Sequence, residues 1–71
     1  MRSDLIEFRH RLGLTQEEFA KLFKKNKQYQ NNVEKGKRKG SAEYWLLIQK
    51  KFKLTNETTL DLMEVTSNEN T

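Results

Sequence analysis

The chain has 71 residues, of which 34% are apolar and 34% are charged, and it contains no cysteine. This length supports one domain with one small core, and the lack of cysteine excludes disulfides and thiolate metal sites. No apolar run approaches the roughly 18 residues that a membrane span needs, and no signal-peptide pattern opens the sequence. We therefore expect a soluble, cytoplasmic protein with no membrane partner.

The formal net charge of +4 is divided unevenly along the chain. Residues 1–54 carry fourteen Lys and Arg against six Asp and Glu, whereas residues 55–71 carry four acidic residues and no basic residue. Residues 24–39 alone hold seven basic residues and one acidic residue. Such a concentration of positive charge is typical of proteins whose partner has a phosphate backbone, although a solvated lysine-rich face has the same composition.

The first helix is expected over Asp4–Leu12. Ser3 is its N-cap candidate, and Gly13 is placed to end it in a left-handed conformation. Apolar side chains at spacings of three and four form its buried stripe, which comprises Leu5, Phe8 and Leu12.

The second helix is expected over Gln16–Phe23. It begins with a capping box, in which the Thr15 hydroxyl binds the backbone N–H of Glu18 and the Glu18 carboxylate binds back. Its inward face comprises Phe19, Ala20 and Phe23.

The third helix is expected over Lys27–Lys35, from an N-cap at Asn26 to an end at Gly36. Its only apolar side chains are Tyr29 and Val33, and the four Gln and Asn between positions 28 and 32 are not explained by helix propensity. Side-chain amides can pair with adenine, and Lys can reach guanine or phosphate, so contact with a DNA groove would explain this composition.

The remainder of the chain predicts two more helices. Ser41 caps a helix over Ala42–Phe52, and Thr55 or Asn56 caps a last helix that runs to about Val65. Trp45, Ile48 and Phe52 are expected to close the core, with Leu46 beside them, and the apolar positions of the last helix are Leu60, Leu62 and Met63. Tyr44 and Leu47 are expected to be exposed. We expect a single domain over residues 1–65 and a flexible tail over residues 66–71.

The segments LGLTQEEFAKLF and VEKGKRKGSAE, followed by an apolar helix, closely resemble the lambda-repressor/Cro-like (XRE-type) helix-turn-helix family. The resemblance covers roughly Leu5–Leu62. It implies an all-α fold, a compact five-helix bundle with a lambda-repressor-like DNA-binding domain, whose third helix is the recognition helix.

The resemblance also implies site residues. Gln16 would contact a DNA phosphate and support the side chain of Gln28. The positions that match base-facing residues are Lys27, Gln28 and Asn31. Those that match residues near the DNA backbone are Asn32, Lys35, Lys37 and Arg38. Arg9 and Glu34 match a pair that forms a buried salt bridge between the first and third helices.

Three positions depart from the family pattern. The turn after the second helix usually has Gly and then an apolar residue, where this chain has Lys24 and Lys25. The inward-facing Ile or Val of the recognition helix aligns with Gln30, and a buried amide without partners costs roughly 1–3 kcal/mol. A small rotation of that helix would turn Gln30 outward and give it and Lys27 the base-facing roles, while withdrawing Asn32.

From these features we expect a sequence-specific DNA-binding transcriptional regulator, a small repressor, that binds double-stranded DNA as a homodimer. The dimer surface is expected at Tyr44, Leu47 and the last helix. The alternative is a protein-interaction module or antitoxin-like partner on the same fold, with weak or lost base readout and a protein partner on the C-terminal helix. The sequence has no phosphate-binding glycine loop, metal-ligand cluster or nucleophile–base arrangement, so we expect neither an enzyme nor a cofactor.

Overall fold

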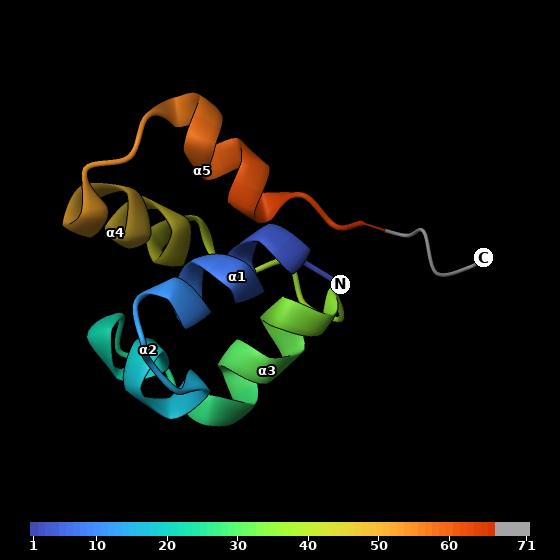
Figure 1. The fold of residues 1–71 in the computed structure, drawn as a ribbon. Coiled ribbons are helices and arrows are strands. Elements are labelled where there is room, and N and C mark those ends of the chain that lie inside the picture. Colours follow the sequence, from blue (N-terminus) through green and yellow to red (C-terminus); the bar gives the residue numbers. More distant parts are fainter. Residues whose placement is uncertain (67–71) are drawn as a thin grey trace.

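The computed structural model describes residues 1–66, which form five α-helices. Their bounds are α1 (Ser3–Arg11), α2 (Gln16–Leu22), α3 (Lys27–Lys35), α4 (Ala42–Phe52) and α5 (Asn56–Met63). Figure 1 shows α1 in the middle of the molecule, with α4 and α5 on one side and α2 and α3 on the other. The expectation of an all-α, five-helix bundle is confirmed. Most of the predicted tail, residues 67–71, lies outside the described residues.

Side-chain caps explain where four of the helices begin. The residue before each of α2, α3, α4 and α5 accepts a hydrogen bond from the backbone N–H three positions later, and these residues are Thr15, Asn26, Ser41 and Thr55. The predicted capping box is complete, because the backbone N–H of Thr15 donates to Glu18 Oε1 at 2.9 Å. The expected Ser3 cap is wrong. Ser3 is itself the first residue of α1, and its hydroxyl pairs with that of Thr66 at 3.0 Å.

The core is built from side chains of all five helices. Its buried apolar members are Leu5, Phe19, Phe23, Val33, Tyr44, Trp45, Ile48 and Leu62. Aromatic rings fill much of it, with Phe8 edge-on to Phe52 at 5.1 Å between ring centroids and Phe23 edge-on to Tyr44 at 5.8 Å. Edge-to-face pairs of this kind are favourable beyond the area that they bury, which suits a core with few apolar residues.

Several expected placements are wrong. Leu46 is 49% exposed and does not lie beside the core residues of α4, whereas Leu47, expected to be exposed, is half-buried against the core. Leu12 is 40% exposed, because it follows the last turn of α1 as the C-cap residue and no longer lies on the buried stripe. Leu60, one of the apolar positions of α5, is 62% exposed and lines a groove. Tyr44 is fully buried, with its hydroxyl donating to Gln30 Oε1 at 2.6 Å, so it cannot form part of an exposed dimer surface.

The end of the described chain is fixed against its beginning. Helix α5 ends at Met63, two residues before the predicted end at Val65. The backbone N–H of Thr66 then donates to Met1 O at 2.7 Å, and the Thr66 hydroxyl donates to the same oxygen at 3.0 Å. Thr66 therefore does not belong to a flexible tail, since four hydrogen bonds join it to Met1 and Ser3.

Candidate nucleic-acid interface

Helices α2 and α3 form a closely packed pair joined by the four residues 23–26. The chain reverses at Lys24, which takes a left-handed conformation with φ +62°. The next residue, Lys25, donates its backbone N–H to Ala20 O at 2.9 Å, which closes the end of α2. Asn26 then caps α3, so α3 starts directly after the turn. Ala20 is fully buried, and its small side chain allows the two helices to approach.

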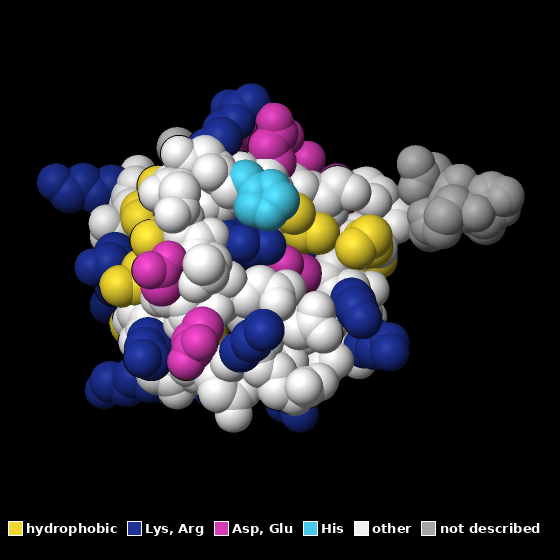
Figure 2. All heavy atoms as spheres, turned by 60° about the horizontal axis from the view of Figure 1, so that its bottom comes forward, with side chains coloured by type: hydrophobic (Ala, Val, Ile, Leu, Met, Phe, Trp, Pro, Cys, Tyr) yellow, Lys and Arg dark blue, Asp and Glu magenta, His cyan; other side chains and the backbone are white. Residues whose placement is uncertain are grey.

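The outer face of α3 is polar. Lys27, Gln28 and Lys35 are exposed, and Asn31 and Asn32 are half-buried. A hollow of about 600 Å³ lies between the start of α2 and the outer face of α3, and it is lined by Gln16, Glu17, Asn26, Lys27, Gln28 and Asn31. In Figure 2, where the α2–α3 side comes forward, much of the view is white, the colour of backbone and uncharged polar side chains, and Lys and Arg side chains lie both around it and near its centre.

Gln30 does not belong to this outer face. Its side chain is fully buried and paired at both ends: its Nε2 donates to Glu34 Oε2 at 2.9 Å, and its Oε1 accepts from the Tyr44 hydroxyl at 2.6 Å. Burial raises the pKa of Tyr44, which keeps this hydroxyl protonated and able to donate. The expectation that α3 rotates to give Gln30 a base-facing role is therefore wrong. The amide can be buried because both of its polar ends have partners.

Glu34 is the centre of a buried polar network. Arg9 donates through Nε to Glu34 Oε2 at 2.6 Å and through Nη2 to Oε1 at 3.1 Å, which forms the expected ion pair between α1 and α3. Gln16 Nε2 donates to Oε1 at 2.9 Å. Burial alone would raise the pKa of Glu34, but hydrogen bonds from Arg9, Gln30 and Gln16, together with the charge of Arg9, hold it below its ordinary value. Among residues 1–66, no buried side-chain nitrogen or oxygen lacks a hydrogen-bond partner.

Gln16 has a different partner from the one expected. Its Nε2 donates to Glu34 and also to Asn31 Oδ1 at 3.2 Å, so both of its amide hydrogens are used within the protein. The expected support of Gln28 by Gln16 is therefore wrong, and the supported side chain on α3 is Asn31. A phosphate contact by the Gln16 amide would require one of these two hydrogen bonds to be exchanged.

The basic loop that follows α3 is held in a defined position. The backbone N–H groups of Lys37 and Arg38 donate to Asn32 O at 2.9 and 3.3 Å, and the Tyr29 hydroxyl accepts from the backbone N–H of Ser41 at 2.8 Å. The Arg38 guanidinium lies over the Tyr29 ring, 5.0 Å from its centroid. Lys37 and Arg38 are nevertheless exposed, so their charges remain available to a partner.

Arg2 is a site residue that the sequence did not indicate. Its side chain is buried, and it donates through Nη1 to Val33 O at 2.6 Å and Arg38 O at 2.8 Å, and through Nε to Met63 O at 2.9 Å. Burial lowers the pKa of Arg2. One side chain thus joins the end of α3, the basic loop and the end of α5. No local pattern marks a residue whose partners lie more than thirty positions away.

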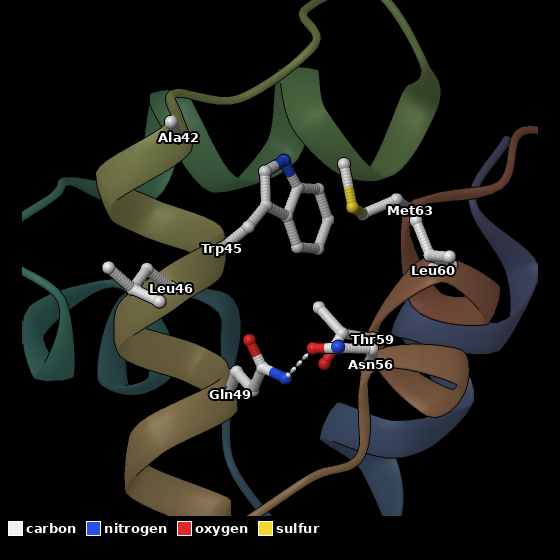
Figure 3. A pocket seen from close by; sticks show the side chains of 8 residues that line it. All are labelled: Ala42, Trp45, Leu46, Gln49, Asn56, Thr59, Leu60 and Met63. Atoms are coloured by element: carbon white, nitrogen blue, oxygen red, sulfur yellow. Dashed lines mark hydrogen bonds between the residues drawn. The ribbon is translucent and has the colours of Figure 1, made fainter.

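A second hollow lies away from this face, between α4 and α5. It is an open groove of about 440 Å³, lined mainly by apolar atoms of Trp45, Leu46, Leu60 and Met63 (Figure 3). Leu46 is 49% exposed and Leu60 is 62% exposed. A hydrogen bond of 2.6 Å from Gln49 Nε2 to Asn56 Oδ1 crosses the groove and fixes the distance between the two helices there.

The α2–α3 face therefore offers amide and ammonium groups, which can donate and accept hydrogen bonds and neutralise negative charge. Within residues 1–66, no cluster of three or more His, Cys, Asp or Glu side chains is arranged to hold a metal ion, and no helix has the length and apolarity of a membrane span. In three comparisons, no family model, no curated protein and no solved structure matched the chain.

Proposed function

We propose that this protein is a sequence-specific DNA-binding transcriptional regulator, a small repressor of the lambda-repressor/Cro-like helix-turn-helix type. The observation that carries the proposal is the outer face of α3, where Lys27, Gln28 and Asn31 line one hollow. Two helices joined by a four-residue turn form the unit that places its second helix in the DNA major groove.

The positive charges beside α3 supply the contacts to DNA phosphates. Lys35, Lys37 and Arg38 are exposed at the end of α3 and in the loop that follows it. Contacts of this kind give much of the affinity and set the orientation of the protein, but they carry no direct information about sequence. Asn32 and Gln16 complete the proposed contacts to the DNA backbone.

The side chains proposed to recognise bases are Lys27, Gln28 and Asn31. A glutamine or asparagine can bind adenine through its oxygen and nitrogen together, and a lysine can bind guanine. Gln30 has no such role, because its amide is buried and fully paired.

The α4–α5 groove is the proposed homodimer surface. Its exposed leucines, Leu46 and Leu60, replace Tyr44, which is buried, and Leu47, which is half-buried against the core. A two-fold dimer would place two copies of α3 on half-sites about one helical turn apart and would double the phosphate contacts. The same groove favours a second candidate function, a protein-interaction or antitoxin-like module whose partner binds α5 and whose base readout is weak or lost.

Selection of bound DNA from a random pool, carried out at low and at moderate salt, separates the two functions. A regulator is expected to enrich one motif at both salt concentrations and to retain a preference for it over random DNA. Failure to enrich any motif, together with binding that disappears at moderate salt, is the behaviour of non-specific phosphate contacts alone. That result would reject the regulator and favour the interaction module.

A further inference from the structure

Two cationic side chains lie on the ring of Tyr29. The Lys25 ammonium is 4.7 Å from the ring centroid, and the Arg38 guanidinium is 5.0 Å from it. The aromatic face attracts each cation, but two cations that share one ring repel each other. An anion that binds both of them would relieve this repulsion. The turn before α3 and the loop after it therefore place their charges where a negatively charged partner is favoured.

Neither cation is neutralised within the described part of the chain. Among residues 1–66, both ion pairs are made by arginines of α1, so no carboxylate there pairs with Lys25 or Arg38. The only acidic residue between positions 24 and 39 is Glu34, which is bound by Arg9 in the interior. Arg38 is exposed and Lys25 is half-buried. Both charges thus remain available to a partner from outside.

The ring and the loop are held in fixed positions. The Tyr29 hydroxyl accepts from the backbone N–H of Ser41 at 2.8 Å, and the ring lies edge-on to that of Tyr44, with 5.4 Å between centroids. Arg2 Nη1 donates to Arg38 O at 2.8 Å, which fixes the backbone that carries the guanidinium. A cation that is held in place before binding loses less conformational entropy when it meets its partner.

Tyr29 projects from the flank of α3 that faces away from the α2–α3 hollow. Successive residues of a helix are about 100° apart around its axis, so Tyr29 points nearly opposite to Lys27, which lines the hollow. An α-helix with its side chains is about 10–12 Å across, and the major groove is about 12 Å wide. A helix in that groove therefore has one phosphate backbone on each flank. The hollow would face one backbone, and the Tyr29 ring would face the other.

We propose that Lys25 and Arg38, positioned by the Tyr29 ring, form a clamp for DNA phosphate on the side of the major groove away from the hollow. Lys25 thereby becomes an additional phosphate contact, supplied by the turn before α3. The ammonium and the guanidinium donate to phosphate oxygens of one nucleotide, or of two neighbouring nucleotides on the same strand. This inference rests on the proposed function.

The first measurement is the salt dependence of binding to duplex DNA, followed by the fluorescence anisotropy of a labelled duplex. Lys25→Ala is expected to weaken binding to all sequences by the same factor, and to reduce the steepness of log K against log salt by about one. Lys25→Arg keeps the charge and should restore the wild-type steepness. Lys51→Ala is the matched control, because Lys51 is exposed on α4, on the other side of α1 from α3 (Figure 1), and it should leave the steepness unchanged.

The second measurement maps the contacted phosphates by ethylation interference on the selected DNA site. Lys25→Ala and Arg38→Ala should each remove interference at the same phosphate or at its neighbour on one strand, because both cations lie on one ring. Tyr29→Leu removes the ring but keeps both charges, so binding should weaken about three- to tenfold. Tyr29→Phe keeps the ring and should bind as tightly as the wild type. Circular dichroism of each variant checks that it is folded.

The outcomes separate this inference from the proposed function. With a motif selected, the inference alone is overturned by an unchanged salt dependence in Lys25→Ala, by an equal effect of Lys51→Ala, by lost contacts on opposite strands, or by equal losses in Tyr29→Phe and Tyr29→Leu. With no motif selected, a reduced steepness in Lys25→Ala on random duplex DNA would reject the sequence-specific regulator and retain the phosphate clamp. A wild type that binds no duplex DNA at low salt would overturn both.

Discussion

At the residue scale, the pairing of Tyr44 with Gln30 decides whether an amide can lie in this core. In Tyr44→Phe, Gln30 Oε1 would remain buried without a donor, since the hydroxyl at 2.6 Å is removed. We expect the free energy of unfolding to fall by about 1–3 kcal/mol, the usual cost of an unpaired buried acceptor. Chemical denaturation followed by circular dichroism measures this loss.

Gln30→Leu and the double variant complete a thermodynamic cycle. Gln30→Leu alone leaves the Tyr44 hydroxyl unpaired, so its cost should be of similar size. In the double variant neither the hydroxyl nor the amide oxygen is left buried without a partner. Its loss of unfolding free energy should therefore be smaller than the sum of the losses in the two single variants. Additive losses would mean that the two side chains do not stabilise the fold as a pair.

The ionisation of Glu34 links the same network to pH. The pKa of Glu34 is lower in the folded protein than its ordinary value. The ionised carboxylate therefore stabilises the fold at pH values above the ordinary pKa, and this stabilisation is lost as the pH falls through the pKa of the folded protein. An NMR titration of the Glu34 carboxyl should therefore give a midpoint below about 4.3, the usual value for Glu. Gln16→Met removes one hydrogen bond to the carboxylate and should move the midpoint upward. A midpoint at or above the usual value would contradict the role of these hydrogen bonds.

At the element scale, the turn between α2 and α3 carries backbone strain that a substitution can relieve. Lys24 has φ +62°, a conformation that costs a non-glycine residue about 1–2 kcal/mol. Lys24→Gly should raise the free energy of unfolding by about 0.5–1 kcal/mol, because glycine relieves the strain but gains freedom in the unfolded chain. Lys21→Gly, inside α2, is the control and should lower it by about 1 kcal/mol. A loss of stability in Lys24→Gly would show that the Lys24 side chain contributes more than its backbone strain costs.

The helices themselves were largely predictable, because the signals that start and stop them are local. Thr15 and Asn26 bind backbone groups three positions away, so sequence spacing is enough to find them. The interior of the site was not predictable in this way. Gln30 finds its partner Tyr44 on another helix, and Arg2 binds Val33 thirty-one positions along the chain. Such pairings depend on how whole helices pack, and periodicity alone had favoured an exposed Tyr44.

At the scale of the whole molecule, the two hollows lie on different sides of α1. The α2–α3 hollow is lined by polar side chains and flanked by positive charge, whereas the α4–α5 groove is lined mainly by apolar atoms. This separation would let one surface bind DNA while the other binds a second copy of the chain (Figure 1). The Arg2 side chain connects the two sides, because it binds carbonyl groups at the ends of both α3 and α5.

If the α4–α5 groove is the dimer surface, a charge at its edge should separate the subunits. Leu60 is 62% exposed, so Leu60→Glu should leave the fold intact while placing a carboxylate against the apolar partner surface. Sedimentation equilibrium should show a concentration-dependent dimer for the wild type and a monomer for Leu60→Glu. Leu12→Glu, at a leucine that is 40% exposed at the end of α1, is the matched control and should still dimerise. A wild type that stays monomeric at all concentrations, or a Leu60→Glu variant that dimerises equally well, would exclude the groove as the dimer surface and leave it to a different protein partner.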